Sequence, residues 1–162
     1  MKRARVGIIA AAIFAVASVT YAQKPDFSGT WTLDPEASGA PAGGGGGGGG
    51  RGGGALGNGP AVVKQTADTL TIERTMGDNK VTSTYKLDGS ESKNTMMGRG
   101  GTPVESVSTA KFDGAKLTIT TKQDMGGQMV ESTQNWTLSG NVLTVESTNA
   151  RGTQKRVYKK TT

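Results

Sequence analysis

The stretch Lys80-Val81-Thr82-Ser83-Thr84-Tyr85-Lys86-Leu87-Asp88-Gly89 places Val81, Tyr85 and Leu87 on one face and its lysines and threonines on the other, and it ends in an Asp-Gly pair. Alternation with a period of two is the pattern of a half-buried β-strand, and Asp-Gly supplies the positive φ angles of a tight hairpin turn. Similar turns follow at Asp113-Gly114 and Ser139-Gly140, after steps of 25 and 26 residues. This regular spacing predicts an up-and-down antiparallel meander.

Ten strands are expected along the chain, and no segment shows a sustained helical period, so the predicted class is all-β. Their ranges are 26–34, 61–66, 69–76, 79–87, 91–97, 103–112, 115–123, 128–138, 141–148 and 153–160. A meander of about eight to ten strands that closes into a small barrel leaves no exposed edge. A flattened sandwich is the alternative architecture.

The inward side chains change character along the predicted strands. The tight turns at 67–68, 88–89, 113–114 and 139–140 all fall at one end, where the inward residues are large and include Trp136. The glycine-rich connections fall at the other end, where the inward residues are polar and include Ser108 and Gln134. The pattern predicts a barrel with one plugged apolar end and one open, polar end.

The first 22 residues have the layout of a secretory signal peptide. Lys2, Arg3 and Arg5 precede an apolar stretch at 6–19, and Ala22 is the small residue at the expected cleavage point. The apolar stretch is too short to span a bilayer comfortably, and a retained anchor is the alternative. We expect an exported protein, periplasmic or secreted, whose residues 23–162 form a single barrel domain.

Residues 38–60 are a low-complexity stretch that contains eight consecutive glycines, Gly43–Gly50. Side chains of this kind bury too little surface to offset the entropy of ordering the chain. We therefore predict a disordered glycine-rich loop after the first strand.

Composition excludes several kinds of chemistry. The chain has no His and no Cys, which rules out disulfides, thiol nucleophiles, Ser-His triads and the usual zinc sites. Without the leader, 16 basic residues stand against 13 acidic ones, and a net charge of +3 is too mild to indicate nucleic-acid binding. The acidic residues leave a glycosidase-type carboxylate pair open, but no sequence feature selects one. The prediction is a protein that is not an enzyme and has no cofactor, catalytic residue or metal site.

Two short stretches at the ends of the meander carry a resemblance. Phe27-Ser28-Gly29-Thr30-Trp31-Thr32-Leu33 and Arg156-Val157-Tyr158-Lys159-Lys160 resemble the first and last strands of the calycins, the superfamily of lipocalins and intracellular fatty-acid-binding proteins. The resemblance implies a barrel that closes first strand to last, with Gly29 and Trp31 as structural residues at its base. It also implies that Arg156 and Tyr158 hold a ligand carboxylate in the cavity.

The residues themselves leave three positions open for Arg156. If Tyr158 faces inward, Arg156 enters the barrel beside it, and a buried guanidinium requires an anion. If Val157 faces inward instead, Arg156 is solvated. In the third arrangement Arg156 stacks on Trp31 as a cation–π contact that closes the barrel.

All five methionines after the leader lie at or near the loop end, and Met97 and Met129 are among them. Because methionine adapts to irregular apolar surfaces, one interpretation is an apolar rim around an open portal. Gap filling near the loops and binding of Cu(I) are the alternatives.

These observations favour a monomeric binding barrel for an apolar or amphipathic small molecule, which on the resemblance carries a carboxylate. The candidate ligand-binding residues are Arg156, Tyr158, Gln134, Ser108, Met97 and Met129, and Trp31, Gly29 and Trp136 are structural candidates. No nucleic-acid partner and no stable membrane insertion after leader cleavage are expected. The alternative function is an envelope interaction or structural module with a fully packed barrel.

Overall fold

The computed structural model describes residues 24–39, 55–76, 79–97, 103–124 and 126–161. Ten strands follow one another along the chain: β1 (Gly29–Asp34), β2 (Ala61–Gln65), β3 (Thr69–Met76), β4 (Asn79–Lys86), β5 (Asp88–Met97), β6 (Pro103–Asp113), β7 (Lys116–Asp124), β8 (Met129–Ser139), β9 (Val142–Asn149) and β10 (Gly152–Thr161). The all-β, ten-strand prediction is confirmed. Within the described ranges, no helix has the length and apolar character needed to cross a membrane.

The strands form one antiparallel sheet in the order β4-β3-β2-β1-β10-β9-β8-β7-β6-β5. The predicted pairing of the first strand with the last is confirmed, with Trp31 opposite Lys160 and Leu33 opposite Tyr158. The hairpin turns at Asp113-Gly114 and Ser139-Gly140 contain Gly114 and Gly140 at φ angles of 60° and 57°, as predicted. The predicted hairpin turn at Asp88-Gly89 was wrong, because these two residues begin β5, and β4 and β5 are the two ends of the strand order and do not pair as a hairpin.

The barrel is nearly closed, and its seam lies between β4 and β5, the two ends of the strand order. Side chains bridge this seam where a strand ladder would otherwise run. The Asn94 amide accepts a hydrogen bond from the Thr84 backbone N–H at 2.8 Å and donates one to the Thr84 carbonyl at 3.0 Å. The Ser92 hydroxyl accepts from the Lys86 N–H at 2.8 Å. Side chains of β5 thus satisfy both backbone groups of Thr84 and the N–H of Lys86 at the seam, in place of a strand ladder.

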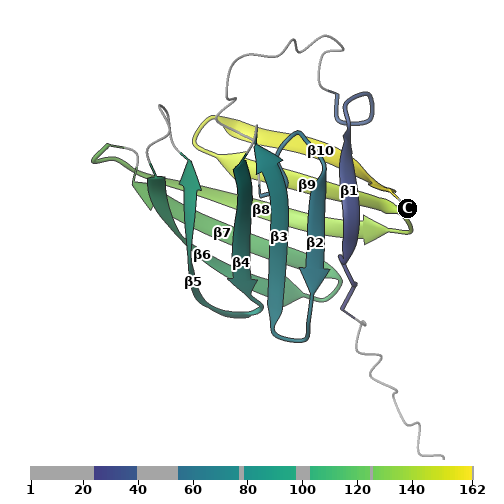
Figure 1. Ribbon diagram of the computed structural model, residues 1–162, viewed down its shortest axis with the longest axis horizontal. Coiled ribbons are helices and arrows are strands. Elements are labelled where there is room, and N and C mark those ends of the chain that lie inside the picture. Colours follow the sequence, from purple (N-terminus) through teal and green to yellow (C-terminus); the bar gives the residue numbers. More distant parts are fainter. Residues whose placement is uncertain (1–23, 40–54, 77–78, 98–102, 125, 162) are drawn as a thin grey trace, which may run out of the picture.

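Strands β2–β4 cross in front of β7–β9, so the barrel is flattened into two facing halves (Figure 1). The apolar core fills the space between these halves. Its largest fully buried side chains are Trp31, Trp136, Tyr158, Phe27, Leu56 and Leu70. Phe27 joins the halves, because its ring stacks on Phe112 at 6.2 Å between centroids and meets Trp136 edge to face at 5.6 Å.

The predicted glycine-rich loop needs a correction at its C-terminal end. Residues 40–54 lie outside the described residues, but the chain is described again from Ala55. Ala55 and Leu56 are 8% and 1% exposed and belong to the core. The expectation that nothing in 38–60 is buried was therefore wrong for these two, because the facing half of the barrel supplies apolar surface that local composition does not reveal.

Candidate functional site

The inward face of β10 carries two of the predicted ligand-binding residues. Arg156 lies opposite Val145 and Tyr158 opposite Leu143, and both partners on β9 are buried core residues. Tyr158 is 1% exposed, and its hydroxyl donates a hydrogen bond to the Gly57 carbonyl at 2.8 Å. Burial raises the pKa of Tyr158, while the positive charge of Arg156 opposes that rise. The phenol is thus held neutral, as a hydrogen-bond donor inside the barrel.

Residues 55–60, which we call the strap, lead from the glycine-rich stretch into β2. The strap meets the predicted site at three points. The Ala55 N–H donates to the Gln134 side-chain oxygen at 3.1 Å, the Gly57 carbonyl accepts from Tyr158, and the Asn58 side-chain oxygen accepts from Arg156. Between the first two contacts, Leu56 inserts its side chain into the core.

The structure adds Arg74, a site residue that the sequence analysis missed. Arg74 lies on β3 opposite Ala61 and Val81, both of which are buried. A side chain added at Gly57 would place its Cβ 3.1 Å from the Arg74 Nη1, so the guanidinium lies against the strap. Its charge also opposes the burial that raises the pKa of Tyr158. The alternation Leu70-Thr71-Ile72-Glu73-Arg74 contained the signal, since it assigns Arg74 to the inward face.

Hydroxyl and amide side chains line the interior of β6, β8 and β9. Ser108 is 1% exposed and shares a hydrogen bond with Thr121 at 2.8 Å. Gln134 is 6% exposed, and its oxygen also accepts from the Trp136 indole N–H at 3.2 Å. Ser147 lies directly opposite Gln134. In the described part of the chain, its hydroxyl is the one buried side-chain polar atom without a hydrogen-bond partner.

The predicted structural residues lie at the tight-turn end. Trp31 and Trp136 are fully buried, and the Trp31 indole donates to the Phe27 carbonyl at 2.8 Å. The Lys160 ammonium, rather than Arg156, lies over the Trp31 ring at 5.6 Å from its centroid. Stacking of Arg156 on Trp31 was therefore the wrong alternative, because β10 pairs Lys160 with Trp31 and places Arg156 four residues away.

Of the two candidate methionines, Met129 does not join this cluster. Met129 is 66% exposed at the start of β8, which puts its thioether on the surface. Met97 is the last residue of β5, and its side chain lies outside the described residues. The predicted apolar rim thus has no described contact with Arg156, Tyr158 or Gln134. The described residues contain no cluster of three or more carboxylates that could hold a metal ion.

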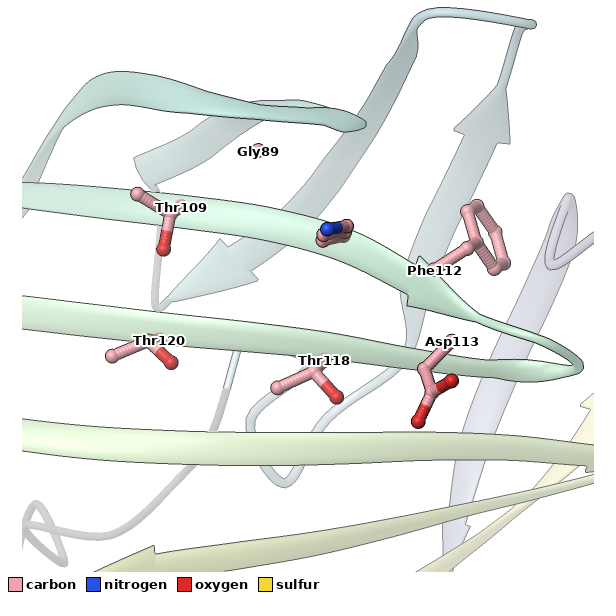
Figure 2. Close-up of a pocket in the computed structure, with 7 residues that line it drawn as sticks. Gly89, Thr109, Phe112, Asp113, Thr118 and Thr120 are labelled. Atoms are coloured by element: carbon pink, nitrogen blue, oxygen red, sulfur yellow. The ribbon is translucent and has the colours of Figure 1, made fainter.

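A depression of about 380 Å³ lies elsewhere, on the outer side of β6 and β7. Figure 2 shows Thr109, Thr118 and Thr120 projecting from these two strands, near Asp113. These threonines alternate with the buried Ser108, Ala110, Leu117 and Ile119. The depression therefore lies mainly on the outer surface, although Phe112, which stacks on Phe27, also lines it.

Comparisons with known proteins identify solved structures with a similar fold. No protein-family model and no curated protein matches the sequence. Among solved structures, secretory abundant heat soluble protein 4 from Ramazzottius varieornatus is 22% identical with a TM-score of 0.52, covering 83% of this chain and 94% of that one. A second secretory abundant heat soluble protein from the same organism is 17% identical with a TM-score of 0.52, covering 83% and 95%.

A third solved structure, the REP1-NXSQ fatty acid transporter, is 16% identical with a TM-score of 0.49, covering 64% of this chain and 70% of that one. The likeness to the two heat soluble proteins extends over nearly their whole length and concerns the fold. Together with the nearly closed ten-strand meander, it establishes a calycin-like β-barrel.

Proposed function

We propose that this chain is a non-enzymatic barrel that binds a small amphipathic molecule through its carboxylate. The observation that supports the proposal is the donor pair on the inward face of β10. Arg156 and Tyr158 each donate to an oxygen atom of the strap, at neighbouring residues Asn58 and Gly57. A guanidinium and a neutral phenol side by side are suited to the two oxygens of a carboxylate.

Arg74 strengthens the electrostatic argument. It brings a second guanidinium to the strap from the opposite half of the barrel. Two positive groups in a partly desolvated interior favour an anionic ligand, because charge interactions are stronger there than in water. The core below the donors offers apolar contacts for the rest of the ligand.

The test is binding of a fluorescent fatty acid by Arg156→Leu. A hydrogen bond to a charged group contributes about 1.5–3 kcal/mol, so affinity should fall at least about tenfold. The matched control is Lys155→Leu, which removes one positive charge from an exposed position of β10 and should leave affinity unchanged. Failure of the wild-type protein to bind the probe at micromolar concentration would contradict the proposed function.

We also propose that the protein is exported. The basic residues Lys2, Arg3 and Arg5, the apolar stretch and Ala22 support this proposal. Protein isolated from the native cell envelope should have the intact mass of a chain that begins at Gln23. A mass that includes residues 1–22 would favour the retained anchor.

A second candidate function is a packed interaction module without a small-molecule ligand. The burial of Leu56 favours it, because the strap then fills the space that a ligand would occupy. The same binding experiment separates the two functions, since a permanently packed barrel binds no probe.

A further inference from the structure

The strap contacts every inward candidate residue of β8 and β10 that was assigned to a ligand. The Gln134 side-chain oxygen accepts a hydrogen bond from the Ala55 N–H. Tyr158 donates to the Gly57 carbonyl, and Arg156 donates to the Asn58 amide oxygen. Three of the four residues 55–58 thus each make a polar contact to one of the proposed binding residues.

The chemistry of these contacts is that of an amphipathic anionic ligand. Gly57 and Asn58 present two neighbouring acceptor oxygens, as a carboxylate does. Leu56 inserts a branched aliphatic group into the core directly beside them, with 1% of its surface exposed. The strap therefore places a pair of acceptor oxygens at Tyr158 and Arg156 and an apolar group in the adjacent core.

We infer that in the ligand-free protein the strap occupies the residues that bind the ligand, and that a ligand binds by displacing the strap. The inference rests on the proposed function. The Tyr158 hydroxyl has one proton to donate and already donates it to Gly57, so a ligand carboxylate must take that bond from the strap. A replacing ligand needs an acceptor for Arg156 and Tyr158 and an apolar group that fills the place of Leu56.

The strap has the contacts expected of an exchangeable element. None of its described residues belongs to a strand, and Asn58, Gly59 and Pro60 are exposed. Its described contacts include the buried Leu56 with Ala55 beside it, the three polar contacts above, and the Arg74 guanidinium that lies against Gly57. A segment outside the strand ladder can open locally at less than the free energy of global unfolding, so a ligand that binds the same partners can shift the balance.

The experiment compares Asn58→Ala with the wild-type protein by calorimetric titration with octanoate. Loss of the Asn58 acceptor weakens the strap and leaves Arg156 available, so octanoate should bind about three- to tenfold more tightly. Asn141→Ala is the matched control, because Asn141 is an exposed asparagine in the β8–β9 turn at the opposite end. Octanol, which lacks the carboxylate, should bind at least about tenfold more weakly than octanoate to both proteins.

A second measurement follows the strap itself. Hydrogen exchange of the Ala55 amide reports on its bond to Gln134. Saturating octanoate should accelerate this exchange, because the ligand displaces the strap, and it should leave the β8–β9 ladder amides protected. Octanoate binding that leaves Ala55 exchange unchanged or slower would overturn the competition and keep the proposed function. Absence of octanoate binding to either protein would overturn both.

Discussion

At the scale of single residues, Gly29 shows how closely the barrel base is packed. Its φ angle is +143°, a backbone conformation that residues with a side chain rarely adopt. A Cβ at this position would also lie 2.3 Å from the Lys160 Cε. The Lys160 stem thus crosses Gly29 to place its ammonium over Trp31. The backbone angle is what favours glycine in the Gly-x-Trp stretch, since the flexible end of Lys160 could move away from a side chain at this position.

A second residue, Glu73, gives the molecule a defined response to acid. Its carboxylate lies on the outer side of β3, 2.7 Å from the Lys80 ammonium on β4 and 2.9 Å from that of Lys64 on β2. The hydrogen bonds from Lys80 and Lys64 lower the pKa of Glu73 from 4.5 to about 2. A carboxyl with a lowered pKa stabilises the folded state above its unfolded pKa, and this stabilisation is lost as pH falls through the folded value.

We therefore expect the free energy of unfolding to decrease as pH falls from 4.5 towards 2, and to decrease less in Glu73→Gln. Urea unfolding at a series of pH values measures this. Glu146→Gln, an exposed substitution on β9, is the control and should follow the wild-type profile. High salt should reduce the difference, because the ion pairs lie at the surface. Identical acid profiles of Glu73→Gln and wild type at low salt would show that the three-residue ion pair does not stabilise the fold.

At the scale of strands, alternation alone left open which face of β10 points inward, and the pairing of β10 decides it. Tyr158 and Arg156 follow the period of two, and pairing with the buried residues of β9 places both toward the interior. The same period also assigned Arg74 to the inward face of β3, but a charged residue is usually solvated, and the sequence analysis left it out.

The strap could not be predicted in the same way. Leu56 is the one large apolar residue between Leu33 and Val62, and glycine, alanine and proline dominate its surroundings. Its burial depends on surface from the facing half of the barrel, which has no counterpart in local composition. A lone leucine in a glycine-rich stretch was the only available signal. Its polar contacts to Gln134, Tyr158 and Arg156 span 79 to 101 residues of sequence.

At the scale of the whole molecule, the core joins two halves of a flattened barrel and includes a segment outside the strands. The strap and Phe27 both enter this core from non-strand positions. A fold with 38 apolar residues among the 140 residues from Gln23 onward has few to spare.

The final prediction separates the strap from the glycine run before it. Leu56→Ala should lower the free energy of unfolding by about 2–5 kcal/mol, because the side chain is 1% exposed and its removal leaves a cavity. Deletion of Gly43–Gly50 should change the melting temperature by only a few degrees, since loop-closure entropy varies slowly with length. Val142→Ala, at a 38% exposed position, is the apolar control and should cost less than Leu56→Ala. Urea and thermal unfolding of the three variants measure the differences. A Leu56→Ala protein as stable as wild type would show that the strap is not part of the core in solution. The inference that Leu56 occupies the place of the apolar part of a ligand would then be wrong.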